Sequence, residues 1–168
     1  HAIISPGGLI HMLNEELGFR GLEVKPINLK QEFFMKALLS DMYDIHVIDA
    51  RAGSGKTLMA FVAAMRLVSK GGYEKIVYVR NSIESVDKGA DIGYLSGNDE
   101  KFRIYNMALY DTLEFIAKKK MKKRENVQEP QVKKKKKVAD LITKYNIEKL
   151  WPGEARGRTL SNAIVIMD

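Results

Sequence analysis

Residues 47–57 read VIDARAGSGKT, and this stretch decides which fold the sequence can adopt. Its last eight residues follow the phosphate-loop pattern Gly-x-x-x-x-Gly-Lys-[Ser/Thr], with Ala50 in place of the first glycine. Glycines in that pattern let backbone N–H groups wrap around phosphate, and the helix that follows contributes its N-terminus. An apolar stretch typical of a strand precedes the loop, and an apolar helix follows it. A glycine-rich turn with a solvent-facing lysine is therefore the less favoured interpretation.

Residues 51–57 of this loop are expected to hold a nucleotide. Lys56 would place its ammonium on the β- and γ-phosphates, and the Thr57 hydroxyl would ligate Mg²⁺. We therefore predict a nucleoside triphosphate and Mg²⁺ as cofactors and Lys56 as a catalytic residue. The other residues expected to contact the nucleotide are Arg51, Ala52, Gly53, Ser54 and Gly55.

The apolar stretch AIVIMD at residues 163–168 delivers a carboxylate at its end. A phosphate-loop NTPase needs a second strand that ends in an Asp, which supports Mg²⁺ through the water shell of the ion. Taken alone, Asp168 is typical of a turn at the end of a strand. Together with the loop, it is predicted to be a metal residue alongside Thr57.

Hydrophobic spacing outside the loop predicts alternating helices and strands. Helices are expected at 28–40, with Asn28 as the N-cap, and at 55–70, 100–119 and 138–151. Buried strands are expected at 45–49, 75–79 and 163–167. This alternation predicts an α/β fold of three layers, α/β/α, in which helices cover both faces of a mostly parallel sheet. We expect an N-terminal arm or lead-in segment at 1–27 and a P-loop domain at 28–168.

The net charge of +7 comes from one segment of the chain. Residues 118–137 hold eleven Lys or Arg and two Glu, so the rest of the chain has 17 basic and 19 acidic residues. Blocks of like charge usually stay disordered, and they also bind polyanions. The segment is interpreted as a Lys-rich insertion that is either a solvated loop or an arm for single-stranded RNA, and the two interpretations are compatible.

Composition excludes several classes of chemistry. The chain has no cysteine, which removes disulfides, thiolate metal sites and cysteine nucleophiles. Its three histidines lack metal-ligand spacing, and no run of 18 apolar residues predicts a membrane span. Because no signal pattern is visible, we expect a cytoplasmic protein without a membrane partner.

Several quoted motifs together resemble the PhoH-like ATPases. NLKQEFFMKALL, DARAGSGKTLMA, KIVYVRNSIESVDKGADIGYLSGNDEKF, ALYDTLEFI and ARGRTLSNAIVIMD occur in the order of that family, over roughly residues 27–117 and 138–168. DIGYLSG and RGRTLSN are the motifs most particular to it. The resemblance implies a RecA-like core related to superfamily-1 helicases, ATP binding and hydrolysis, and action on RNA.

Three features depart from the family pattern. The usual Asp-Glu-Ala-Gln-Asn run stops after Asp168, so the catalytic Glu and the following strand are outside this sequence, and the core is expected to be incomplete at the C-terminus. We therefore expect this chain to bind ATP and to hydrolyse it slowly. An Arg-Pro of the family reads Arg80-Asn81 here, and the Lys-rich insertion is not part of the pattern.

Gln31 and three arginines are further candidate site residues. Gln31 lies where helicase-like proteins keep a glutamine that binds the adenine edge, yet it also occupies the capping-box position three residues after Asn28. Arg80, Arg156 and Arg158 are candidates for phosphate or nucleic-acid contacts, and their alternative is a weak surface salt bridge. Arg158, within the RGRT run, is the one predicted to be catalytic.

The leading hypothesis is a Mg²⁺-dependent ATPase of PhoH type that binds or remodels RNA through the basic segment and the arginines. The first alternative is an RNA-binding module in which ATP only switches the shape of the protein, without efficient hydrolysis. A P-loop kinase is the third hypothesis, although no arginine-bearing lid or acceptor site is recognisable. A homo-oligomer is also expected, since ATPases that share sites across an interface often form rings.

Overall fold

The computed structural model describes residues 2–4, 10–12, 24–40, 42–80, 107–121, 131–150 and 152–168. The strands are β1 (Ala2–Ile4), β2 (Ile10–Met12), β3 (Lys75–Val79), β4 (Ile147–Leu150) and β5 (Ala163–Met167). The helices are α1 (Leu29–Leu38), α2 (Lys56–Ser69), α4 (Met107–Met121), α5 (Gln131–Lys144) and α6 (Pro152–Ala155). No helix in these ranges is both long and apolar enough to cross a membrane.

A three-stranded parallel sheet with the order β4-β3-β5 forms the centre of the fold. β3 pairs with both neighbours, so that Val77 lies opposite Glu148 on one side and Val165 on the other. Four of the five β3 residues are buried, as expected for a parallel strand that is covered on both faces. The sheet confirms the predicted α/β class with parallel strands.

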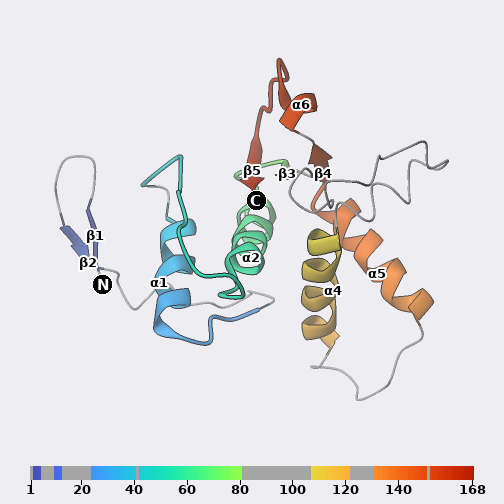
Figure 1. Cartoon of the computed structure of the whole chain (residues 1–168), viewed down its shortest axis with the longest axis horizontal. Helices are drawn as coiled ribbons and strands as arrows, with labels where there is room; N and C mark the ends of the chain where they lie inside the picture. The colour runs from blue at the N-terminus through green and yellow to red at the C-terminus, as the bar shows by residue number, and fades with distance from the viewer. Residues whose placement is uncertain are drawn as a thin grey trace, which may run out of the picture.

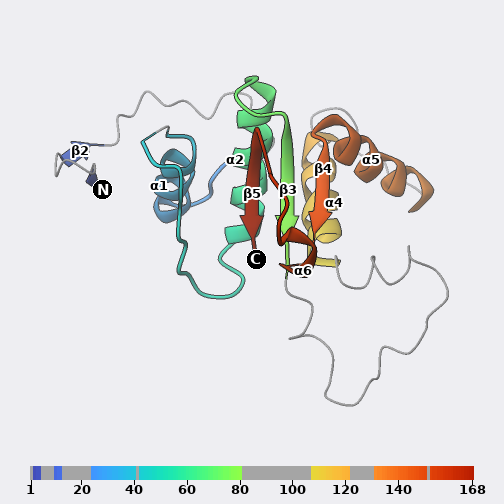
Figure 2. The same cartoon turned by 90° about the horizontal axis from the view of Figure 1, so that it is seen from above.

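The longer helices lie together on one face of this sheet, as Figures 1 and 2 show. α2 packs behind β3 and β5, α4 and α5 cover the β4 side, and α1 packs against α2. Among the described residues, the other face carries α6 and the segment 156–162 (Figure 1). The main core therefore lies between the sheet and the helices, and includes Phe61, Ile76, Tyr78, Leu113 and Ile147.

α2 begins and ends at glycines, as the sequence predicts. Gly55 precedes it with φ +86°, and Gly71 follows it with φ +80°. Both values lie in the left-handed region that only glycine adopts easily, and the N–H of Gly71 donates to the carbonyl of Val68 at 2.9 Å. Between these points the helix buries Met59 and the run 61–65 against the sheet and the neighbouring helices.

Residues 45–49 do not form the predicted strand. They are irregular, with Ile45 81% and Val47 93% exposed. A strand needs a hydrogen-bonded neighbour and a buried face, and neither is present for this stretch among the described residues. β5 was expected as a buried strand, but it is the edge strand of the described sheet, and Met167 is 78% exposed.

The prediction of one helix over residues 138–151 is also wrong. The helix ends at Lys144, Asn146 takes φ +47°, and the chain then enters β4. Ile147 and Leu150 fit a helical spacing, but pairing with β3 outweighs that local preference.

The basic segment 118–137 is helical at both of its ends, over 118–121 and 131–137, where a solvated loop was one interpretation, and its residues 122–130 lie outside the described residues. α4 extends to Met121, and α5 begins at Gln131, so all five lysines of 133–137 belong to a helix. Val138 and Leu141 of α5, together with Tyr145 just after its end, are buried and anchor the helix. α4 begins at Met107, and residues 100–106 of the helix predicted there lie outside the described residues. The lead-in segment contains a short antiparallel pair, β1 with β2, which the sequence did not predict.

Candidate functional site

The phosphate loop follows the irregular stretch at residues 45–49 and enters α2 through two left-handed glycines. Gly53 has φ +73° and Gly55 has φ +86°, so a side chain at either position would strain the backbone. Gly55 is the N-cap of α2 and supplies no side-chain acceptor to the first turn. The first N–H groups of α2 thus combine with the loop to form the kind of backbone arrangement that holds an anion.

Lys56 reaches back across the loop that precedes it. Its Nζ donates to the backbone carbonyls of Ala50 at 2.8 Å and Arg51 at 3.2 Å. An ammonium has three donors, so one remains for a phosphate oxygen while the other two hold the loop together. The predicted role of Lys56 is compatible with this geometry.

Thr57 and Asp168 meet, although 111 positions separate them in the sequence. The Thr57 Oγ1 lies 3.3 Å from Oδ1 and 3.2 Å from Oδ2 of Asp168. The Asp168 N–H donates to the carbonyl of Val79 at 3.0 Å, which continues the pairing of β5 with β3 up to the carboxylate. The structure therefore brings the two predicted metal residues together at the edge where the parallel strands end.

The two residues fit a Mg²⁺ ion. The Thr57 hydroxyl can donate its proton to Asp168 and still offer a lone pair to a cation. Mg²⁺ prefers oxygen ligands and keeps several waters, so it is usually held by few protein groups together with substrate phosphates. In the described part of the chain no group of three or more His, Cys, Asp or Glu could form a complete metal cage. A shared site for Mg²⁺ and phosphate suits these residues better than a cage made of protein ligands alone.

Tyr78 also contacts this carboxylate, which the sequence did not predict. Its hydroxyl donates to Oδ2 of Asp168 at 2.9 Å, and its ring packs against Phe61 of α2 with centroids 5.4 Å apart. Burial, followed by the hydrogen bond to Asp168, raises the pKa of Tyr78 well above its usual value of about 10. The available signal was a single hydroxyl in the apolar strand KIVYV, because a buried tyrosine hydroxyl needs a partner.

Gln31 bonds to the phosphate loop and to the chain that enters α1. Its Nε2 donates to the carbonyl of Ser54 at 3.0 Å, and its Oε1 accepts from the N–H of Ile27 at 3.0 Å. Asn28 is the N-cap of α1, as predicted, and its Oδ1 accepts from the backbone N–H of Gln31 at 2.9 Å. The reciprocal half of a capping box would join the Gln31 side chain to the N–H of Asn28, and the structure joins it to Ile27 instead. A contact of Gln31 with adenine stays a prediction.

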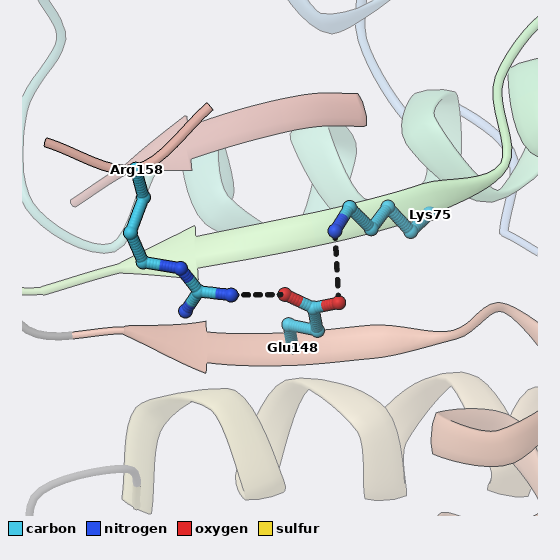
Figure 3. Close-up of polar contacts among 3 residues, drawn as sticks. All are labelled: Lys75, Glu148 and Arg158. Carbon is cyan, nitrogen blue, oxygen red and sulfur yellow. Dashed lines mark hydrogen bonds and ion pairs between the residues drawn. The ribbon is translucent and has the colours of Figure 1, made fainter. Parts of the chain in front are cut away.

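The structure does not bring Arg158 to the phosphate loop. Its Nη2 lies 3.7 Å from Oε2 of Glu148, whose Oε1 lies 2.9 Å from Nζ of Lys75 (Figure 3). Side chains alternate along a strand, so Lys75 and Val77 lie on one face of β3 while Tyr78 lies on the face of α2. Arg158 thus occupies the face of the sheet opposite Thr57. Its predicted catalytic role has no described contact to support it.

The other two candidate arginines lie in different settings. Arg80 follows β3 directly and is close enough to affect the electrostatics of Tyr78. Arg156 is exposed in the turn after α6. The DIGYLSG motif at 91–97 lies outside the described residues.

Comparison with known proteins gives one consistent result. A family model described as PhoH-like protein matches residues 23–168. A PhoH-like protein of Synechocystis sp. is 30% identical over 151 residues, which are 89% of this chain and 39% of that protein. Protein PhoH2 of Mycolicibacterium smegmatis is 28% identical over 155 residues, covering 92% and 30%. Protein PhoH2 of Bacillus subtilis is 34% identical over 95 residues, covering 55% and 21%. The chain spans about two-fifths or less of these relatives.

Proposed function

The chain belongs to the PhoH-like protein family of P-loop NTPases, and from this premise we propose that it binds ATP with Mg²⁺ and hydrolyses it. The observation that carries the proposal is the meeting of the Thr57 hydroxyl with the Asp168 carboxylate, 3.2 Å apart, beside a loop with two left-handed glycines. This arrangement supports the proposal because it combines backbone donors that suit phosphate with a hydroxyl and a carboxylate that suit Mg²⁺.

The chemistry would be attack of water on the γ-phosphorus, with cleavage of its bond to the oxygen that bridges to the β-phosphate. Backbone N–H groups of the loop and of the first turn of α2 would hold the phosphate oxygens, and Lys56 would offset their negative charge. Mg²⁺, when bound, supplies a further positive charge to the same oxygens. The Thr57 hydroxyl would bind the ion directly, and Asp168 would bind the water molecules that surround it.

The test is calorimetric titration of MgATP into the wild-type chain and into Lys56→Ala. Loss of a charge-assisted contact to phosphate should weaken binding by about 10–100-fold. Lys70→Ala is the matched control, because Lys70 is an exposed lysine at the other end of α2. A wild-type chain that binds no MgATP, or equal affinities in wild type and Lys56→Ala, would refute the proposal.

RNA is the partner that the charge distribution favours. The five lysines of 133–137 are consecutive in the sequence of α5, and such a concentration of positive charge would attract the phosphates of a single strand. This observation also favours the alternative function, an RNA-binding module that ATP switches without efficient hydrolysis. A homo-oligomer and a cytoplasmic location stay predictions from the sequence.

Salt dependence and phosphate release together separate these functions. Each lysine–phosphate contact on single-stranded RNA contributes about 0.7 to the log–log slope of affinity against salt. Replacing the five lysines with glutamine keeps good helix formers on α5 and should lower that slope by up to about 3.5. An unchanged slope would exclude these lysines from RNA binding. Release of phosphate that RNA stimulates would favour the ATPase, and ATP-dependent RNA affinity without turnover would favour the switch.

A further inference from the structure

The Asp168 carboxylate accepts hydrogen bonds from hydroxyl groups on two different elements. Thr57 of α2 approaches both of its oxygens, and Tyr78 of β3 donates to Oδ2 at 2.9 Å. The Tyr78 contact is the shortest of the three distances. An ionised carboxylate has about four lone-pair positions, so these two donors leave others for water in the shell of a cation.

The position of Tyr78 is rigid, because its side chain is 1% exposed and its ring packs on Phe61. Its backbone belongs to the central strand, which pairs along its whole length with β4 or β5. The pairing of β3 and the contact with α2 together fix the position of the Tyr78 hydroxyl. Asp168 itself is exposed and follows the edge strand of the described sheet, so packing restrains its side chain less than that of Tyr78.

We propose that Tyr78 is a positioning residue for the metal site: its hydroxyl holds the Asp168 side chain in the rotamer that faces Thr57. The proposal rests on the function proposed above and adds a residue to it. Hydrogen-bond partners behind a metal-site ligand commonly change metal affinity or activity about 10–100-fold when they are removed. The competing interpretation is that Tyr78 only fills the core, in which case its hydroxyl is dispensable.

Tyr78→Phe separates these interpretations, because it removes one oxygen and keeps the ring on Phe61. The measurement is the Mg²⁺ concentration at half-maximal binding of a fluorescent ATP analogue, with ATP binding in EDTA as a second reading. We expect this Mg²⁺ concentration to rise by about tenfold and binding in EDTA to stay unchanged. Tyr110→Phe is the matched control, since the Tyr110 hydroxyl also has a polar partner, Nζ of Lys149 at 2.9 Å, away from the site.

A double-mutant cycle with Asp168→Asn supplies a reading that core packing would not change. If Tyr78 acts through Asp168, Tyr78→Phe should have little further effect on the Mg²⁺ requirement of Asp168→Asn. An unchanged Mg²⁺ requirement in Tyr78→Phe would overturn the inference, as would an equal shift in Tyr110→Phe or full additivity in the cycle. With a wild type that binds MgATP, those results reject the role of Tyr78 alone. A wild type that binds no MgATP rejects the proposed function and this inference together.

Discussion

Gly55→Ala tests whether Gln31 and the phosphate loop support each other. A Cβ at Gly55 would lie 3.3 Å from Nε2 of Gln31, while a Cβ at Gly53 would have nothing within 4 Å. Both glycines have similar left-handed dihedrals, with φ +86° and +73°. Gly53→Ala is therefore a matched control that keeps the backbone strain and lacks the contact with Gln31.

The size of the effect follows from three contributions. Alanine in the left-handed region costs roughly 1–2 kcal/mol, and restriction of the unfolded chain returns about 0.4–1 kcal/mol. Both variants share these two terms, so each should lose about 1 kcal/mol. At 3.3 Å the Gln31 amide must move, and two hydrogen bonds hold it at 3.0 Å each, to Ser54 and to Ile27. Loss of the bond to Ser54 adds about 1 kcal/mol for Gly55→Ala alone.

Urea unfolding of the single variants and of their combinations with Gln31→Ala measures this extra term. Removing Gln31 first should lower the cost of Gly55→Ala by about 1 kcal/mol and leave the cost of Gly53→Ala unchanged. MgATP affinity should follow the same order, because the Ser54 carbonyl belongs to the loop. Additive effects of Gly55→Ala and Gln31→Ala would refute the contact as an energetic link between α1 and the loop.

Three further predictions concern stability. The pKa of Tyr78 is raised in the folded state, so the free energy of unfolding, measured without Mg²⁺, should fall as the pH rises above about 10, more steeply than in Tyr78→Phe. Glu148→Gln removes the charge that pairs with Lys75, which is only 20% exposed, and should lower the free energy of unfolding by about 1 kcal/mol. Arg158→Ala should lower it by less, because Arg158 is 47% exposed and its ion pair with Glu148 is weakened by solvent. Asn28→Ala should lower the free energy of unfolding by about 1 kcal/mol through loss of the α1 cap, and an unchanged value in urea would contradict that assignment.

The parts of the site that depend on local sequence could be predicted. Gly53 and Gly55 take left-handed dihedrals that favour glycine, and Lys56 and Thr57 are the first two residues of the helix that follows. The sequence predicted that Thr57 and Asp168 belong to one metal site, from the phosphate-loop pattern together with a strand that ends in Asp. The structure places the two side chains 3.2 Å apart, although residues 45–49 before the loop form no strand. In these cases the local pattern and the tertiary structure agree.

Other elements depend on neighbours that a single sequence does not reveal. Ile147 and Leu150 suit either a helix or a strand, and only pairing with β3 decides between them. The apolar residues at 45–49 suit a strand, yet Val47 stays 93% exposed because the described chain supplies no partner. The contact of Tyr78 with the site was missed for the same reason, because the partner of its hydroxyl is the Asp168 carboxylate, which comes from a distant part of the sequence.

Side chains alternate along β3, so the two faces of the sheet make different contacts. Tyr78 faces α2 and reaches Asp168. On the opposite face Lys75 meets Glu148 (Figure 3), and Val77 packs in a small second core with Val79 and Leu150. Among the described residues, a side chain on the second face connects to the phosphate loop through the backbone of the sheet, which is stiff where β3 pairs on both sides. Substitutions at Glu148 or Arg158 should therefore change stability before they change MgATP affinity, whereas removal of the Tyr78 hydroxyl should do the reverse.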